Sequence, residues 1–173
     1  ANPLDERAAL ALSRLLLERA RREGDTRQAG RALAALSAWT SPSEAPTRIA
    51  LQWATVQQHL HAFDPAAAVL KTVTQRDPQD AQAWLTLATV RRVQGRLDES
   101  QQACDGLARI PLATLYAQAC EAENLGLRGS VQPARVRLAR MVADPNTQPD
   151  QRAWIMVTLA DLEVRLGHPV RAE

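Results

Sequence analysis

The two cysteines are the residues whose type and spacing most directly suggest covalent chemistry. Cys104 lies seven residues before Pro111, and Cys120 lies nine residues after it. If Pro111 marks the turn between two antiparallel helices, the thiols lie at similar heights on neighbouring helices. In an oxidising compartment a disulfide would close a loop of about 17 residues and contribute roughly 3 kcal/mol on a chain-entropy model. The alternative is two small buried side chains in a reducing cytoplasm, because equal height alone does not make the two Cβ atoms converge.

Two histidines and a nearby aspartate, His59, His61 and Asp64, invite a metal-site interpretation. Positions i and i+2 on a helix point about 200° apart, so the two imidazoles do not face one ion. We therefore predict no metal ion and no cofactor. The sequence also lacks the glycine-rich phosphate-binding, G-x-S-x-G and H-E-x-x-H motifs. We expect that the chain is not an enzyme.

The composition favours a helical protein with a mixed-charge surface. With 173 residues and 46% hydrophobic content, the chain is long enough to bury a substantial core. Its 21 basic and 19 acidic side chains are interspersed, and aromatic residues make up only 3%, which argues against nucleic-acid binding. No run of 18 apolar residues is present, so no membrane span is expected.

A repeat of about 34 residues organises the chain. Apolar or small residues at i, i+3, i+4 and i+7 mark one helix face in each repeat. The third members of these faces are separated by 37, 34 and 34 residues: Leu33, Leu70, Cys104 and Leu138. Four prolines follow at intervals of 36, 33 and 34 residues: Pro42, Pro78, Pro111 and Pro145. Proline lacks the N–H donor and clashes with the preceding turn, so each second helix is predicted to end before its proline.

A first helix and a turn precede each second helix. In the first repeat, the first helix is expected to pack through Ala8, Ala11, Leu12 and Leu15. Three turns carry a glycine suited to the left-handed conformation that ends a helix: Gly24, Gly95 and Gly129. The second repeat turns over residues 61–64 instead, where Asp64 is expected to cap the next helix.

These features resemble the tetratricopeptide repeat, a 34-residue helix-turn-helix unit with the pattern W-x2-L-G-x2-Y, A-x3-F, P. The best copy reads Trp84-x2-Leu87-Ala88-x2-Arg91, Ser100-x3-Cys104, Pro111. It keeps Trp, Leu and Pro, whereas Ala replaces Gly, Arg replaces Tyr, and Ser and Cys replace the A-x3-F pair. The resemblance implies an all-α fold, a right-handed α-solenoid of antiparallel helix-turn-helix repeats in a single domain over residues 1–173. An ordinary antiparallel helical bundle is the alternative.

About four and a half units are expected, over residues 4–42, 46–78, 81–111, 112–145 and 149–173. The last unit has one helix, from about Trp154 to Gly167, and its partner helix would begin near Pro169. Either the chain belongs to a longer protein, or another copy covers this unit, since a terminal repeat needs a cap. The predicted oligomer face is Leu159, Leu162 and Leu166.

The resemblance also implies a concave groove, lined by the first helices, that binds a peptide or helix of a partner protein. The predicted groove residues are Arg14, Glu18, Arg21, Arg22, Thr55, Gln58, His59, Thr89, Arg92 and Glu123. The arginines are placed to pair with an acidic segment. Alternatively, they are solvated cations favoured by the helix dipole. Some such repeats grip a C-terminal carboxylate with Lys and Asn, but Lys71 is the only lysine and lies outside the first helices.

We therefore expect a non-catalytic interaction scaffold or adaptor that binds a segment of another protein. One alternative is an assembly subunit that homo-oligomerises through its fifth unit, and another is an RNA-binding helical repeat. Cytoplasm and periplasm both remain open. The start at Ala1 and the placement of the two cysteines favour a bacterial cell envelope.

Overall fold

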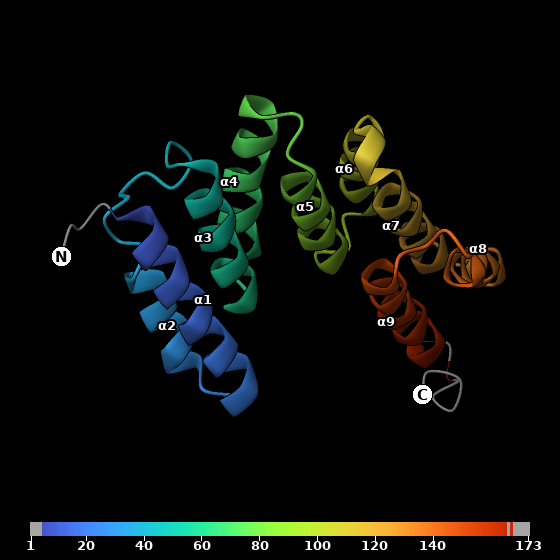
Figure 1. Cartoon of the computed structure of the whole chain (residues 1–173), viewed down its shortest axis with the longest axis horizontal. Coiled ribbons are helices and arrows are strands. Elements are labelled where there is room, and N and C mark those ends of the chain that lie inside the picture. The colour runs from blue at the N-terminus through green and yellow to red at the C-terminus, as the bar shows by residue number, and fades with distance from the viewer. Residues whose placement is uncertain (1–4, 166, 168–173) are drawn as a thin grey trace. The chain divides into compact units, whose positions relative to one another are not determined.

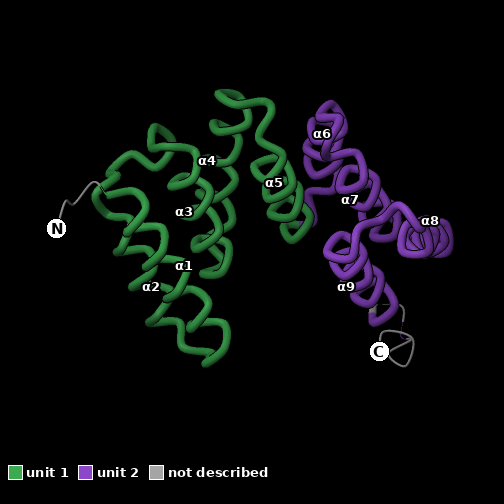
Figure 2. Tube along the Cα trace, in the orientation of Figure 1, with its two compact units in different colours: residues 1–94 green, residues 95–173 purple. Residues whose placement is uncertain are grey.

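The computed structural model describes residues 5–165 and 167. These residues form nine α-helices and one short 3-10 helix, so the predicted all-α helical-repeat fold is confirmed. Contacts divide the chain into two compact units, Ala1–Gln94 and Gly95–Glu173, which Figure 2 colours separately. The boundary falls at the turn of the third predicted repeat. The single domain and the repeat boundaries expected from the sequence stay predictions.

The first unit contains two helix pairs and one further helix (Figure 1). Its helices are α1 (Glu6–Glu23), α2 (Thr26–Ala34), α3 (Thr47–His59), α4 (Phe63–Arg76) and α5 (Ala81–Val93). The pairs are α1 with α2 and α3 with α4, and α5 packs against α4. The first helices are also neighbours, because α3 contacts both α1 and α5.

The second unit is built around one central helix. Its elements are α6 (Leu97–Ala108), η1 (Pro111–Ala113), α7 (Thr114–Leu127), α8 (Val131–Ala143) and α9 (Pro149–Arg165). Helix α7 contacts α6, α8 and α9. Small residues of α7 allow this close packing: Ala119 and Ala122 are fully buried beside Leu138 and Ile155.

Local sequence signals explain where several helices begin and end. The Asp5 and Asp80 side chains cap α1 and α5 by accepting the backbone N–H groups of Ala8 and Ala83, at 3.0 and 2.8 Å. The three predicted turn glycines all adopt the left-handed conformation: Gly24 at φ 65°, Gly95 at φ 73° and Gly129 at φ 96°. Helix α4 ends at Arg76 and α8 at Ala143, in each case two residues before a proline.

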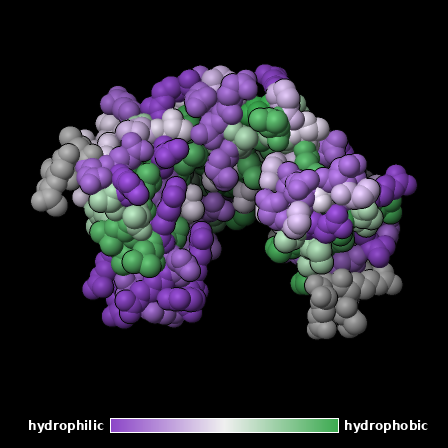
Figure 3. Space-filling view, viewed as in Figure 1, coloured by the Kyte–Doolittle hydropathy of each residue, from purple (hydrophilic) through white to green (hydrophobic). Residues whose placement is uncertain are grey.

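The packing face predicted for the first helix is wrong. Leu12 and Leu15 are 50% and 63% exposed, and Figure 3 shows an apolar patch over the middle of α1. The buried face of α1 is instead Leu10, Ser13, Leu17 and Ala20. Both sets follow helical spacing, so periodicity alone does not say which of them contacts a neighbour.

The repeat explains why Leu12 and Leu15 are exposed. The first two repeats are offset by 37 residues, the separation between Ala29 and Ala66. With this offset, Leu12 and Leu15 of α1 correspond to Ile49 and Gln52 of α3. Both are buried, with Ile49 in a cluster that includes Leu36 and Gln52 bonded to Ser13. Those contacts come from the preceding helix pair, and none of the described residues forms such a pair before α1.

The expected cap at Asp64 is also wrong. Helix α4 begins at Phe63, and its N-cap residue is Ala62, which makes no side-chain capping bond. The Asp64 carboxylate lies in the first turn and accepts a hydrogen bond from Gln94 Nε2 at 2.9 Å. Asp64 therefore ties the start of α4 to the end of α5.

Candidate partner-binding site

A pocket of about 310 Å³ opens in the first unit. It is called here the first-unit pocket, and it is lined by Arg21, Thr55, Gln58, His59, His61, Phe63 and Val93. The lining comes from α1, α3, α4, α5 and the turn between α3 and α4. Four of the ten predicted groove residues lie together in it: Arg21, Thr55, Gln58 and His59.

Buried contacts hold the α1 side of the pocket against the α3 side. Leu17 of α1 and Val56 of α3 share an apolar cluster, with Leu17 one turn before Arg21 and Val56 next to Thr55. A buried hydrogen bond of 3.1 Å from Gln52 Nε2 to Ser13 Oγ joins the same two helices. These contacts fix the positions from which the polar lining residues extend.

A second set of contacts forms the apolar side of the pocket. The bond from Gln94 to Asp64 holds the end of α5, where Val93 is 57% exposed, against the start of α4, where Phe63 lies. The Phe63 ring meets the His61 ring edge to face, with centroids 5.5 Å apart. This wall offers carbon surface beside the polar residues.

His61 adopts an unusual backbone conformation. Its φ is 59°, and it is the only residue other than glycine with positive φ in the part of the chain that the structure describes. The corresponding turns after α1, α5 and α7 have glycine in this conformation. A side chain in the left-handed region costs free energy relative to glycine, so the turn before α4 carries backbone strain that the glycine turns avoid.

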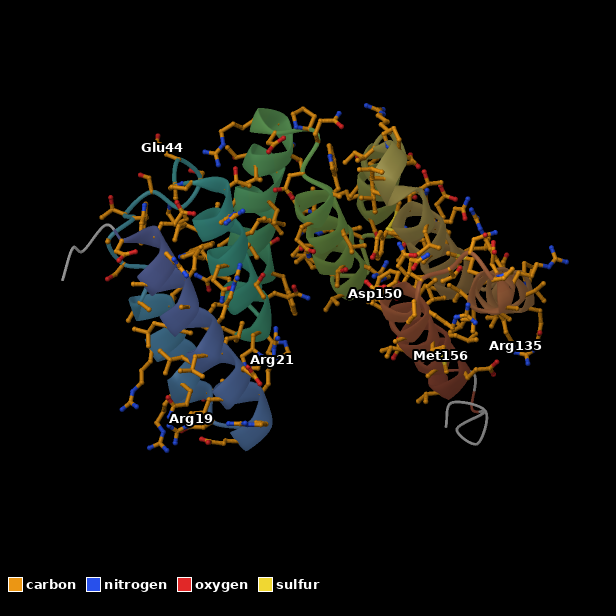
Figure 4. The ribbon with its side chains drawn as sticks, viewed as in Figure 1. Arg19, Arg21, Glu44, Arg135, Asp150 and Met156 are labelled. Atoms are coloured by element: carbon orange, nitrogen blue, oxygen red, sulfur yellow. A yellow bond between two sulfur atoms is a disulfide. The ribbon has the colours of Figure 1, made fainter. Side chains whose placement is uncertain are left out.

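The polar lining presents hydrogen-bond donors and no carboxylate. Within residues 5–165 and 167, the side chains of Arg21, Gln58 and His59 form no hydrogen bond or ion pair. Thr55 differs, since its hydroxyl donates to the Leu51 carbonyl at 2.8 Å. In Figure 4 Arg19 and Arg21 are labelled on different sides of α1. Arg19 bonds Glu23 at 2.9 Å, whereas Arg21 lines the pocket.

The other predicted groove residues lie outside this pocket. Arg14, Glu18 and Arg22 are exposed on α1. On α5, Arg92 Nη2 donates to Thr89 Oγ1 at 3.3 Å. Glu123 is half-buried on α7, in the second unit.

Sequence reasoning did not select His61, Phe63 or Val93 as site residues. A signal was available for His61, because it stands where the other turns have glycine. Phe63 is the only phenylalanine in the chain, but nothing in its spacing places it beside a first helix. Val93 joins the pocket through the packing of α5 on α4.

The predicted oligomer face needs correction. Leu162 is only 5% exposed and packs in the core of the second unit, where a Cβ atom added at Gly126 would lie 2.8 Å from its Cδ1. Leu159 is half-buried against the same core, and Leu166 lies outside the described residues. The apolar residues that α9 exposes are Met156, Val157 and Val164, at 52%, 70% and 55%.

The structure joins Cys104 of α6 and Cys120 of α7 by a disulfide, with the Cα atoms 5.8 Å apart. Both residues are fully buried. Asn124, also fully buried, donates to Cys104 Sγ at 3.3 Å and accepts from Ser100 Oγ at 3.0 Å. Covalent and polar contacts together link α6 to α7.

Among the described residues, no three His, Cys, Asp or Glu side chains cluster in a way that would hold a metal ion. No helix formed by residues 5–165 combines the length and apolarity needed to cross a bilayer.

The fold is similar to that of known tetratricopeptide repeat proteins. A family model described as tetratricopeptide repeat matches residues 57–122. A tetratricopeptide repeat protein from Parabacteroides merdae is similar in structure, with a TM-score of 0.70 and 18% identity over 99% of this chain. This chain spans 64% of that protein's length. A TPR protein from Thermus thermophilus gives a TM-score of 0.64 with 17% identity, over 92% of this chain and 86% of that one. No curated protein matches the sequence.

Proposed function

We propose, from the premise that this chain is a tetratricopeptide-like helical repeat protein, that it is a non-catalytic interaction module. It binds a segment of a partner protein across the first helices of the first unit. Helical repeats of this kind commonly serve as protein-interaction scaffolds. Packed helices fix the binding residues in advance, which lowers the ordering cost of binding a flexible segment.

One observation carries this proposal. The first-unit pocket brings together four residues that the repeat register had assigned to a binding groove, and three of them have side chains without partners among the described residues. Open donors beside exposed carbon surface are what a peptide-binding site needs, because both polar and apolar contacts contribute. The pocket is also small enough to take one or two side chains rather than a large ligand.

The proposal is tested by selecting peptides from a phage-displayed random dodecapeptide library against the wild-type chain. Selected peptides are then titrated by fluorescence anisotropy against Thr55→Phe, whose ring fills part of the pocket. Thr72→Phe is the matched control, because both threonines donate their hydroxyl to the carbonyl four residues earlier and Thr72 lies exposed on α4. We expect Thr55→Phe to weaken binding at least tenfold, about 1.4 kcal/mol, and Thr72→Phe to leave it unchanged. Equal affinities for the two variants would contradict the proposed site.

A second candidate function is assembly of several copies through α9. This candidate rests on α9, which leaves Met156, Val157 and Val164 more than half exposed, because an interface between copies would bury apolar surface of this kind. Light scattering over a range of concentrations tests this candidate. A mass that rises with concentration in the wild type and stays monomeric in Val157→Asp would support it, and a constant monomer mass would exclude it.

We also propose an oxidising compartment, such as a bacterial periplasm, for this chain. The disulfide between Cys104 and Cys120 supports this location, because disulfides persist in oxidising compartments and are rare in the cytosol. Thiol titration of denatured, unreduced protein purified from its natural source should find no free thiol. Two free thiols would overturn this location.

A further inference from the structure

We infer that the exposed leucines of α1 bind α9 of a second copy of this chain, so that copies join head to tail. The α1 stripe is defined here as Leu12 and Leu15, and the α9 stripe as Ala153 and Met156. This inference rests on the second candidate function, assembly through α9, and adds the surface that α9 contacts.

The turn residues with positive φ set the correspondence between the first helices of the repeats. They are separated by 37, 34, 34 and 38 residues: Gly24, His61, Gly95, Gly129 and Gly167. With these offsets, Leu12 of α1 corresponds to Ile49, Ala83, Ala117 and Ile155 in the later first helices. Leu15 corresponds in the same way to Gln52, Thr86, Cys120 and Thr158.

The two positions of the α1 stripe are buried in every later first helix. Each of their counterparts in α3, α5, α7 and α9 is at most 8% exposed, whereas Leu12 and Leu15 are 50% and 63% exposed. A helix that ends a stack of repeats carries a polar outer face. Apolar side chains at these two positions of α1 therefore indicate that another helix covers them.

The internal contacts of the first unit show which surface fits these positions. Gln52 of α3, the counterpart of Leu15, donates a hydrogen bond of 3.1 Å to Ser13 of α1. In the next step along the chain, Ala83 of α5 shares an apolar cluster with Ala50 of α3, which is the counterpart of Ser13. The stripe positions of one helix thus receive the Ser13 position of the preceding first helix.

Helix α9 leaves this matching surface uncovered. The counterpart of Ser13 on α9 is Met156, labelled in Figure 4, and it is 52% exposed, whereas Ser13 is fully buried. A contact between copies that repeats the packing of α1 on α3 places Met156 of one copy against Leu15 of the next. The polar pair of Ser13 and Gln52 is then replaced by an apolar pair, so both uncovered faces have the same chemistry.

Charge favours this pairing over the pairing of two identical helices. Outside its ion pair between Arg19 and Glu23, α1 exposes four arginines against one glutamate, Glu18. Among the side chains that the structure describes on α9, the exposed charged ones are Asp150 and Asp161. Opposite charges attract when α1 meets α9, whereas two α1 helices or two α9 helices would bring like charges together.

The contact is small, so the association is weak. In the first unit Ile49 also packs on Leu36, which follows α2, and the described part of α9 supplies only the first-helix share of such a contact. An interface below the about 1,600 Å² of a standard complex is typical of transient association, with dissociation constants of roughly 10 µM to 1 mM expected. The contact joins different faces of two copies, so further copies can add at both ends.

The test measures mass by sedimentation equilibrium over roughly the same range of concentrations. Leu15→Asp changes the α1 stripe, and Met156→Asp changes the α9 stripe. The control variants are Leu112→Asp and Val136→Asp, because these two apolar residues are 95% and 42% exposed outside both stripes. Thermal melts by circular dichroism verify that each variant is folded.

We expect the mass of the wild type to rise with concentration and both controls to follow it. Leu15→Asp and Met156→Asp should each stay monomeric, with association weakened at least about tenfold, because the contact would bury an unpaired carboxylate. An equimolar mixture of these two variants should form a species of about twice the monomer mass and nothing larger. The Leu15→Asp chain keeps the α9 stripe and the Met156→Asp chain keeps the α1 stripe, so the two complement each other once.

Each other result overturns a defined part of the account. If Leu15→Asp assembles as the wild type does while Met156→Asp stays monomeric, α9 pairs with itself, which overturns the inference and leaves assembly through α9 standing. Assembly of Met156→Asp overturns both. Two monomeric variants that do not combine in the mixture overturn the head-to-tail contact. A wild type that is monomeric throughout removes the inference and the assembly candidate, and leaves the peptide-binding proposal untouched.

Discussion

The ring of His61 contacts that of Phe63 edge to face, with centroids 5.5 Å apart, while the His61 backbone holds the left-handed conformation at φ 59°. The two residues flank the beginning of α4 and line the same pocket. An unfavourable backbone geometry is thus combined with a favourable aromatic contact at the proposed binding site.

Replacing His61 by glycine should separate stability from binding. Glycine adopts positive φ without the steric cost of a Cβ atom, so His61→Gly should raise the free energy of unfolding by about 0.5–1 kcal/mol. The same change removes a lining side chain and should weaken binding of the selected peptides. Urea unfolding and anisotropy titration check the two effects, and a variant that is less stable than the wild type would contradict this account of His61.

Removing the disulfide should lower stability without abolishing the helical fold. The disulfide between Cys104 and Cys120 joins residues 16 apart in the sequence. On the chain-entropy model, its removal should lower the free energy of unfolding by about 3 kcal/mol. The expected result for Cys104→Ala with Cys120→Ala is a lower urea midpoint and an unchanged far-ultraviolet spectrum. The same midpoint in both proteins would mean that the bridge contributes nothing to stability.

Two glycines in helices should respond in opposite ways to alanine. At Gly126 a Cβ atom would lie 2.8 Å from Leu162 Cδ1 and 3.3 Å from Ala134 Cβ. Overpacking should therefore outweigh the gain in helix propensity, and Gly126→Ala should lower the free energy of unfolding by about 1–2 kcal/mol. At Gly30 in α2 nothing lies within 4 Å, so Gly30→Ala should stabilise by about 0.5–1 kcal/mol. Thermal and urea unfolding of the two variants, measured side by side, decide this point, and a stabilised Gly126→Ala would show that α7 and α9 pack less closely than described.

The buried face of α1 predicts different losses of stability when Leu17 and Leu15 are replaced by alanine. Leu17 is 3% exposed and belongs to the cluster under α1 and α3, so Leu17→Ala should cost about 2–5 kcal/mol. Leu15 is 63% exposed, so Leu15→Ala should change stability by no more than about 0.5 kcal/mol. The reverse order in urea unfolding would restore the face expected from the sequence.

Much of the fold follows from the sequence because the repeat is local. The spacing of Leu70, Cys104 and Leu138 sets the register of helices that are indeed buried on that side. The same register placed Arg21, Thr55, Gln58 and His59 on first helices, and the structure brings them to one pocket. The buried register and the position of these four residues both depend on contacts within a helix pair or between adjacent first helices.

The predictions that failed concern side chains whose burial depends on which helix packs against them, and the sequence pattern does not specify that helix. The stripe with Leu12 and Leu15 has the same spacing as the stripe with Leu10 and Leu17, and only the position of α2 and α3 distinguishes them. Phe63 and Val93 meet the pocket through the packing of α4 with α5. The exposure of Leu162 was misjudged because the close approach of α9 to Gly126 is a tertiary feature.

The most direct test of the central claim is a titration of the uniformly 15N-labelled chain with a selected peptide, followed by amide chemical shifts. The account predicts that the largest shift changes cluster at Arg21, Thr55, Gln58 and His59, and that Thr55→Phe removes them. Shift changes centred on α9 around Val157, with the pocket residues unmoved, would contradict it.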